Sequence, residues 1–289
     1  MRFGQKDTMR RQFAQPMWDG SALEGRRILL HAEQGLGDTL QFVRYAPLVR
    51  QRGGFVILEC QQTLLRLLAG ASGIDRLIAR GHPLPDFDCH APLLSLPAIF
   101  RTAIDTIPAA VPYVEVAPVE VERWREIIES RAGARGGLKV GLTWAGNPRH
   151  RNDRNRSLSP RDLSALASLD QTVFFQLQKD AAAAPDLEMI ELLDGSSDFL
   201  DTAAILQNLD LLISVDTSVA HLAGALGRPV WTLLPFAPDW RWMTGRSDSP
   251  WYPSMRLYRQ QRRKDWAEVL QRVRADLTLS GFAANGSTA

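Results

Sequence analysis

The chain has 289 residues, of which 45% are hydrophobic and 23% charged, as in an ordinary soluble globular protein. A usual domain size of roughly 150 residues predicts two domains. The formal net charge of +2 argues against a broad basic field for nucleic-acid binding, so we expect no nucleic-acid partner.

The sequence also bears on location and on cysteine chemistry. No apolar run approaches the ~20 residues that a membrane span requires, and the N-terminal segment lacks the apolar core of a signal peptide. We therefore expect a cytoplasmic protein without an integral membrane segment. Cys60 and Cys89 are unclustered, which predicts two buried thiols rather than a disulfide or a zinc site.

In the first half of the chain, short β-rich runs alternate with longer helical patterns, which is typical of parallel α/β architecture. The strand candidates are residues 27–32, 55–60 and 76–79. Three prolines, Pro108, Pro112 and Pro118, interrupt residues 103–122, so this segment is not one helix and reads as a linker. We place an N-terminal domain at residues 1–117.

The pattern restarts after an amphipathic helix predicted near residues 120–131. The strand candidates of this second half are residues 138–146, 171–177, 209–215 and 228–234. We place a C-terminal domain at residues 118–279, whose last helix packs either within that domain or back on the N-terminal one. The composition of residues 280–289 predicts a disordered tail.

The first strand candidate leads into Gly35-Leu36-Gly37-Asp38-Thr39-Leu40, which resembles the start of a dinucleotide-binding loop. The match fails because Leu40 replaces the third glycine and Asp38 puts negative charge where a pyrophosphate would sit. A carboxylate at this position can accept a proton, and Gly35 and Gly37 let a ligand approach the backbone. Asp38 is therefore either a catalytic base or the N-cap of a helix that begins at Thr39.

In the second half, an apolar strand candidate leads directly into Asp216-Thr217-Ser218 and a helix of small residues that carries His221. Such a helix start offers backbone N–H groups, two hydroxyls and the positive end of the helix dipole, all suited to a diphosphate. The alternatives are an ordinary capped turn for Asp216 and a packed histidine for His221.

A basic loop follows the first strand candidate of the same half. It contains Asn147 and His150 together with Arg149, Arg151, Arg154 and Arg156. Guanidinium groups at the carboxyl edge of a parallel sheet suit an anionic ligand, because ligands bind such sheets at that edge. A solvated basic loop is the alternative reading for any single arginine.

Residues 235–253 contain several aromatic residues in a segment that Pro and Gly prevent from being a regular element. Aromatic side chains in a loop can stack on a sugar or a nucleobase, or they can fill the core between the two domains. We select Trp240 and Trp242 as candidate ligand-binding residues.

Four segments together carry a resemblance to a known family: GLGDTLQFVRYAPL, GLTWAGNPRHRNDRNRSLSP, DFLDTAAILQNLDLLISVDTSVAHLAGALGRPVWTLLP and DWRWM…SPWYPSMRLYRQ. Across residues 16–275 the chain resembles the glycosyltransferase-like domain found after tetratricopeptide repeats in bacterial proteins. That domain is similar to glycosyltransferase family 9, the lipopolysaccharide heptosyltransferases. The resemblance implies the α/β GT-B architecture, in which two Rossmann-like parallel-sheet domains face each other across a cleft, with the acceptor side in the first domain.

The resemblance also implies roles for individual residues. Asp38 matches the Gly-Asp of the heptosyltransferases, where the carboxylate acts as base. Asp216, Thr217 and His221 match the donor-binding pattern Asp-Thr-Gly-x-x-His, from which Ser218 departs because the pattern has glycine there. The implied site contains no metal and no cofactor besides the nucleotide-sugar substrate.

These assignments predict a metal-independent inverting glycosyltransferase of the hexosyl or heptosyl type, acting on a glycan, lipid or protein hydroxyl. Asp38 is the predicted base, while Arg156, near the family's phosphate-binding lysine, and Lys179 are predicted to hold the leaving diphosphate. The predicted substrate-binding residues are Gln34, Gly35, Gly37, Asn147, Arg149, Arg154, Arg156, Lys179, Asp216, Thr217, Ser218, His221, Trp240 and Trp242.

Two other functions remain open on the same residues. An epimerase-like enzyme would act on the nucleotide sugar without a separate acceptor, and a non-catalytic module would bind the nucleotide sugar without turnover. The sequence shows no tetratricopeptide repeats of its own, so we expect either a stand-alone domain or a partner with such repeats that docks the acceptor.

Overall fold

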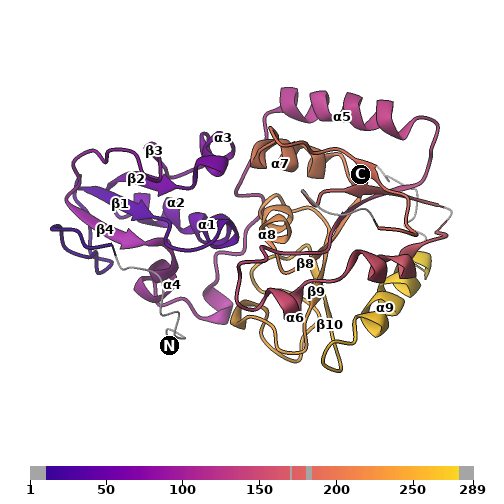
Figure 1. Ribbon diagram of the computed structural model, residues 1–289. Coiled ribbons are helices and arrows are strands. Elements are labelled where there is room, and N and C mark those ends of the chain that lie inside the picture. Colours follow the sequence, from indigo (N-terminus) through magenta and orange to yellow (C-terminus); the bar gives the residue numbers. More distant parts are fainter. Residues whose placement is uncertain (1–10, 170, 180–183, 280–289) are drawn as a thin grey trace, which may run out of the picture. The chain divides into compact units, whose positions relative to one another are not determined.

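The computed structural model describes residues 11–169, 171–179 and 184–279 of the chain (Figure 1). The chain forms two compact units, Met1–Glu115 and Val116–Ala289. The disordered tail expected at residues 280–289 lies outside the described residues.

The first unit is built on a four-stranded parallel sheet with the strand order β3-β2-β1-β4. Ile28, Leu29 and Leu30 are fully buried in its central strand, as expected for a parallel strand that is covered on both faces. The elements of this unit are β1 (Arg27–His31), α1 (Leu36–Phe42), α2 (Ala46–Arg50), β2 (Phe55–Cys60), α3 (Leu65–Leu68), β3 (Arg76–Ala79), β4 (Cys89–Pro92) and α4 (Leu96–Ile99).

The three strands expected in the first unit are present as β1, β2 and β3. Strand β4 was missed because it is four residues long and ends in Pro92, and prolines generally argue against a strand. Both cysteines are buried free thiols, as expected.

An N-terminal segment without regular structure covers part of one face of this sheet. Phe13 packs against an apolar cluster that includes Leu29 and Phe87, and Arg11 forms an ion pair with the fully buried Glu59. The backbone N–H of Trp18 donates to the carbonyl oxygen of β4 residue 90 at 2.8 Å. The segment thus supplies part of the apolar layer that a helix would otherwise provide.

The second unit contains a six-stranded parallel sheet with the order β10-β9-β8-β5-β6-β7. From β5 (Leu138–Thr143) the chain builds the sheet in one direction, and at β8 (Leu211–Val215) it returns to the other side of β5. Numbered from its own first strand, this is the order of a complete dinucleotide-binding fold. Ligands bind such folds beyond the carboxyl ends of the two strands at the reversal, here β5 and β8.

The remaining elements of the second unit are α5 (Pro118–Ala132), α6 (Asp153–Arg156), β6 (Thr172–Gln176), β7 (Ile190–Glu191), α7 (Phe199–Gln207), α8 (Ser218–Ala225), β9 (Val230–Leu234), β10 (Met255–Arg259) and α9 (Trp266–Leu279). Strands β7 and β10 were not predicted. The former is two residues long, and the latter lies at the edge of the sheet and contains two arginines among apolar residues.

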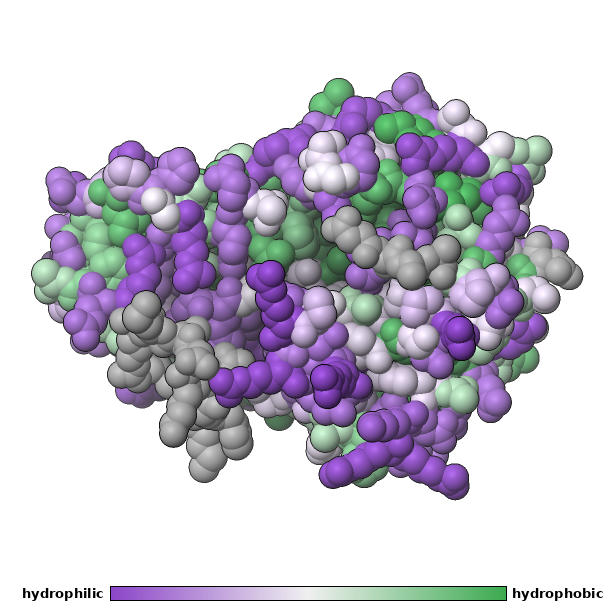
Figure 2. Space-filling view, in the orientation of Figure 1, coloured by the Kyte–Doolittle hydropathy of each residue, from purple (hydrophilic) through white to green (hydrophobic). Residues whose placement is uncertain are grey.

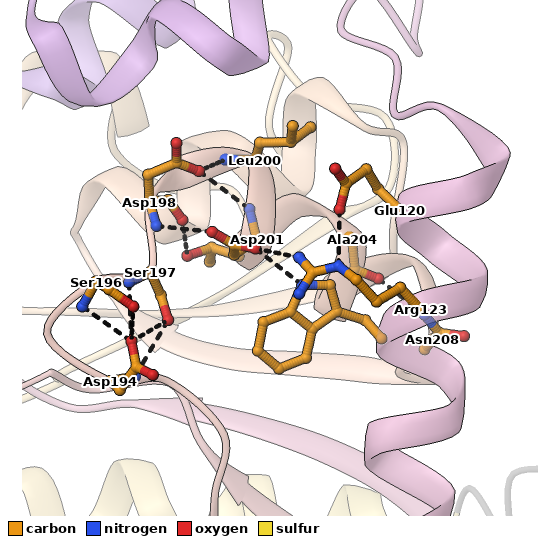
Figure 3. Close-up of polar contacts among 12 residues, drawn as sticks. Glu120, Arg123, Asp194, Ser196, Ser197, Asp198, Leu200, Asp201, Ala204 and Asn208 are labelled. Atoms are coloured by element: carbon orange, nitrogen blue, oxygen red, sulfur yellow. Dashed lines mark hydrogen bonds and ion pairs between the residues drawn. The ribbon is translucent and has the colours of Figure 1, made fainter.

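Helices cover both faces of this sheet (Figure 1). Helix α9 buries Val269, Leu270 and Val273 in a core cluster with residues of β5 and β8. Its buried face therefore packs within the second unit, which is one of the two arrangements considered from the sequence. On the other side, Trp124 of α5 donates its indole N–H to the buried Asp201 of α7 at 3.1 Å, which joins these two helices (Figure 3).

None of the described helices is both long and apolar enough to cross a membrane. Hydrophilic residues cover much of the face drawn in Figure 2, and hydrophobic residues form small separate groups between them.

Candidate functional site

The carboxyl ends of β5 and β8 bring Arg156 and Asp216 together. Arg156 lies in the one-turn helix α6, and its Nη1 donates to the backbone carbonyl oxygen of Asp216 at 2.8 Å. Its Nε lies 3.4 Å from Oδ1 of Asp153, and only 15% of its side chain is exposed. The prediction that the two loops meet at the carboxyl edge of one sheet is therefore confirmed for this pair.

Gly146 is required for this position of the guanidinium group. A Cβ at residue 146 would lie 2.4 Å from Nη2 of Arg156 and 2.7 Å from its Cζ, well inside van der Waals contact. The backbone N–H of Gly146 donates to Oγ of Ser157 at 2.9 Å, and that hydroxyl donates to Asp153 at 2.9 Å. The loop is thus held closed around the guanidinium group.

The start of helix α8 has no side-chain cap. Thr217 is the N-cap residue and has the extended backbone expected there, but its hydroxyl makes no capping hydrogen bond. Instead, Oγ1 of Thr217 lies 3.1 Å from Oγ of Ser214, which accepts a hydrogen bond from Thr143 on β5. The side chain of the N-cap residue therefore satisfies none of the N–H groups in the first turn of α8.

His221 lies one turn into α8 in a buried polar group. Its Nε2 is 3.9 Å from Oδ1 of Asp216, which is an electrostatic contact rather than a hydrogen bond. On the other side of the ring, Nδ1 lies 2.9 Å from the hydroxyl of Tyr252. The face of the ring stacks on Trp242, with centroids 5.2 Å apart.

Burial raises the pKa of Asp216 above its ordinary value. The indole N–H of Trp242 and the guanidinium groups of Arg156 and Arg241 act in the opposite direction, whereas the charge of Asp239 adds to the rise. The carboxyl group therefore takes up a proton more readily than an exposed aspartate would.

The two selected tryptophans lie in different environments. Trp240 is 52% exposed, and the guanidinium group of Arg241 lies 4.9 Å from the centre of its ring. Trp242 is fully buried and stacks on His221, so it lies in the interior of the second unit and offers no surface for a ligand. Only Trp240 presents a surface on which a ligand could stack.

The basic loop presents several side chains to solvent. Asn147, Arg149 and Arg154 are all exposed. Oδ1 of Asn147 accepts the backbone N–H of Arg149 at 2.9 Å, an Asx turn that shapes the loop. Arg156 is thus the loop arginine that the structure fixes most firmly, and the others form an exposed basic surface beside it.

Lys179 follows β6 and has a different partner. Its Nζ donates to the carbonyl oxygen of Ser197. Ser197 belongs to a turn organised by Asp194, which Figure 3 shows. Hydrogen bonds from Ser196 and Ser197 lower the pKa of Asp194 to about 2, so the turn carries a charged carboxylate at neutral pH. Within the described part of the chain, no contact joins Lys179 to Arg156 or Asp216.

The turn that contains Asp38 differs from the one expected. Helix α1 begins at Leu36 with Gly35 as its N-cap, so the prediction of a helix that begins at Thr39 is wrong. Asp38 is the third residue of the helix, and its Oδ2 accepts the backbone N–H of Gly35 at 2.8 Å. Gly37 lies within the first turn of the same helix.

Gln61, which was not predicted, holds this turn in place. Its Nε2 donates to the carbonyl oxygen of Gln34 at 3.0 Å, and its Oε1 accepts the hydroxyl of Thr39 at 2.9 Å. Gln61 directly follows β2, the neighbour of β1, so only the strand pairing brings it to the loop. Tyr252 was missed for the same reason, since it lies 31 residues from His221 in the sequence.

The described residues contain no group of three or more His, Cys, Asp or Glu side chains that could hold a metal ion.

Part of the second unit matches a known protein family. Residues 171–269, which include β8, α8 and β9, match glycosyltransferase family 9 (heptosyltransferase). This part of the second unit is similar to glycosyltransferase family 9. The resemblance to this family expected from the sequence is thereby confirmed, and the match supports the predicted class, a glycosyltransferase.

Solved structures with the family 9 fold resemble the chain over most of its length. A family 9 glycosyl transferase from Veillonella parvula covers 92% of this chain and 100% of its own, with a TM-score of 0.62 and 12% identity. The Escherichia coli ADP-heptose lipopolysaccharide heptosyltransferase II covers 89% of this chain and 98% of its own, with a TM-score of 0.57 and 13% identity. The predicted fold class, α/β with two parallel-sheet domains, is confirmed.

A curated relative extends the likeness beyond the family 9 domain. The protein FlbA of Caulobacter vibrioides is 27% identical over 308 aligned residues, which cover 96% of this chain and 50% of FlbA. The chain therefore spans about half the length of the curated relative that it matches.

Proposed function

We propose that the chain is a glycosyltransferase that moves a sugar from a nucleotide-sugar donor to a hydroxyl group of a glycan, lipid or protein. The observation that carries the proposal is the uncapped N-terminus of α8 beside the guanidinium group of Arg156. Both lie at the strand reversal where folds of this kind bind ligands. The family 9 match of the same region supports it.

The second unit would bind the diphosphate of the donor. The N–H groups of the first turn of α8 and the positive end of its dipole attract an anion. Arg156 adds a fixed charge, and the exposed Arg149 and Arg154 extend the basic surface. Trp240 could stack on the sugar or the base of the nucleotide.

Asp38 would act as the general base. Its carboxylate removes the proton of the acceptor hydroxyl, and the acceptor oxygen attacks the anomeric carbon of the donor. The bond between this carbon and the diphosphate oxygen breaks, and the electron pair leaves with the diphosphate. A single displacement of this kind inverts the anomeric centre.

The positive groups of the second unit would stabilise the leaving diphosphate in place of a metal ion. On this proposal, transfer continues in EDTA and needs no cofactor besides the donor. We further propose that the protein acts in the cytoplasm. A partner with tetratricopeptide repeats could dock the acceptor.

A change at the first residue of α8 tests the anion site. Ser218→Pro removes one N–H group but suits the first position of a helix, and the extended backbone of Thr217 suits the residue before a proline. We expect this variant to keep its melting temperature and to bind ADP, UDP or GDP about tenfold more weakly than wild type. Ser218→Ala keeps the N–H group and is the matched control. Equal calorimetric affinities of the Pro and Ala variants would contradict the proposal.

A panel of nucleotide sugars with and without candidate acceptors then separates the functions. Transfer that requires an acceptor and persists in EDTA supports the proposal. Epimerised donor without an acceptor would identify an epimerase-like enzyme instead, and donor binding without turnover a binding module. Activity that EDTA abolishes and magnesium restores would contradict metal independence.

A further inference from the structure

The contact between Tyr252 and His221 depends on the absence of a side chain at Gly224 of α8. Tyr252 is fully buried, and a Cβ at residue 224 of α8 would lie 2.4 Å from Cδ1 of its ring. With Gly224 in place, the hydroxyl of Tyr252 comes to 2.9 Å from Nδ1 of His221. The ring of Tyr252 thus lies against the backbone of α8 at Gly224, and this position allows its hydroxyl to contact His221.

The position of His221 on its helix directs the opposite edge of its ring toward the candidate site. Side chains of a helix lean toward its N-terminus, and Nε2 of His221 lies 3.9 Å from Asp216, which precedes the N-cap of α8. Trp242 fixes the plane of the ring by stacking on it at an angle of 26°. The imidazole is thus held by Trp242, which stacks on its face, and by Tyr252, whose hydroxyl contacts Nδ1.

The charges around the ring favour one tautomer. Oδ1 of Asp216 lies on the Nε2 side of the ring, so the ionised form of this carboxyl group electrostatically favours a proton on that nitrogen. Nδ1 then carries a lone pair, which accepts the O–H of Tyr252. In this state Nε2–H is a donor directed toward the N-terminal end of α8.

We propose that Tyr252 is a positioning residue that keeps His221 in the Nε2–H tautomer, so that Nε2–H donates to a phosphate oxygen of the nucleotide-sugar donor. This step rests on the proposed function of the second unit. Without the hydroxyl, Nδ1 and Nε2 compete for the proton, and part of the population presents a lone pair to the anionic ligand. Binding then loses a donor although the packing of the ring is unchanged.

Nitrogen-15 spectra of the histidine side chains test the tautomer directly in the unliganded chain. The sequence has five histidines, and His221→Gln assigns the signals of His221. We expect the Nε2–H form to dominate in the wild type and both tautomers to appear in Tyr252→Phe. Tyr258→Phe is the matched control, because Tyr258 also donates its hydroxyl within the second unit, to Asp276 at 2.8 Å. An unchanged tautomer in Tyr252→Phe would overturn the proposal.

A double-mutant cycle tests the consequence for binding, with ADP, UDP and GDP as probes. We expect Tyr252→Phe to weaken binding about fivefold, as for the loss of one hydrogen bond, and His221→Gln to weaken it at least as much. In the double variant, Tyr252→Phe should add nothing to the effect of His221→Gln, because the hydroxyl acts through the imidazole. Additive effects would overturn the proposal.

The two readouts separate this inference from the proposed function. If the wild type binds none of the three probes, the proposed donor site is wrong, whereas the spectra still decide whether Tyr252 sets the tautomer. If the probes bind and Tyr252→Phe shows wild-type affinity, the donor site stands and the positioning role is wrong.

Discussion

The β1–α1 turn and the β8–α8 turn have the same construction and opposite electrostatics. In each, a buried parallel strand leads into a helix with an aspartate close to its start. Asp38 lies inside its helix and accepts the N–H of the N-cap residue, so the protein supplies its own anion there. Asp216 precedes the N-cap, and the start of its helix has no side-chain cap. On the proposed function, the position of the acid relative to the N-cap separates a helix start that the protein caps itself from one that receives a phosphate.

The largest expected effect concerns the first turn. Asp38→Asn should keep the hydrogen bond from Gly35, since an amide oxygen also accepts, but it removes the base. We expect sugar transfer to fall ~100-fold or more, with donor affinity and melting temperature nearly unchanged. Asp38→Ala is the companion variant and should also lose about 1 kcal/mol of stability. Wild-type turnover of the Asn variant would remove Asp38 from the mechanism.

The strand before the first turn should give the protein a specific sensitivity to acid. β1 ends in the buried His31, whose pKa burial and the nearby positive charges lower to about 4, from 6.5. Between pH 4 and pH 6.5, His31 binds more protons in the unfolded chain than in the folded one. Its contribution to the free energy of unfolding is therefore fully present above pH 6.5 and is lost as the pH drops toward 4. The loss amounts to about 3 kcal/mol at most.

Denaturant titrations at several pH values measure this effect. His31→Phe should flatten the dependence, whereas His82→Gln should leave it unchanged because His82 is exposed. A slope that is the same in His31→Phe and the wild type would assign the acid sensitivity to other groups.

In the second turn, Arg156→Met should weaken binding of a nucleoside diphosphate about 10- to 100-fold. The change removes the guanidinium group and leaves the carbonyl of Asp216 without this donor. Calorimetry measures the effect, with Arg161→Met as control because Arg161 is exposed near the same loop. Equal affinities of Arg156→Met and Arg161→Met for the nucleoside diphosphate would contradict the role of the second turn as an anion site.

The smallest expected effect comes from Gly146. In Gly146→Ala the new Cβ would overlap the end of the Arg156 side chain, which can move aside without a change in the fold. We therefore expect an affinity loss of about threefold and a nearly unchanged melting temperature. Gly195→Ala is the control, since a Cβ there meets nothing within 4 Å. A large drop in melting temperature would instead show that the loop is rigid around Gly146.

Local pattern sufficed for the strands with continuous apolar runs, such as β1 and β8, and for the turn at Asp216, because these signals are contiguous in the sequence. The start of α1 was misplaced because Gly35 and Gly37 are poor helix signals, and only the hydrogen bond to Asp38 reveals the cap. The burial of Trp242 and the contacts of Gln61 depend on elements distant in sequence. The spacing of apolar residues along the sequence gives no information about contacts between distant elements.

The N-terminal segment that covers the first sheet sets a limit on how the chain can be shortened. Phe13 packs into an apolar cluster and Arg11 pairs with the buried Glu59. These residues therefore belong to the folded unit, although the described part of the chain has no strand or helix before Arg27. Trimming to the first strand would leave the buried Glu59 without its partner Arg11. A recombinant fragment of this unit should therefore begin at or before Arg11 rather than at Arg27, where the first strand begins.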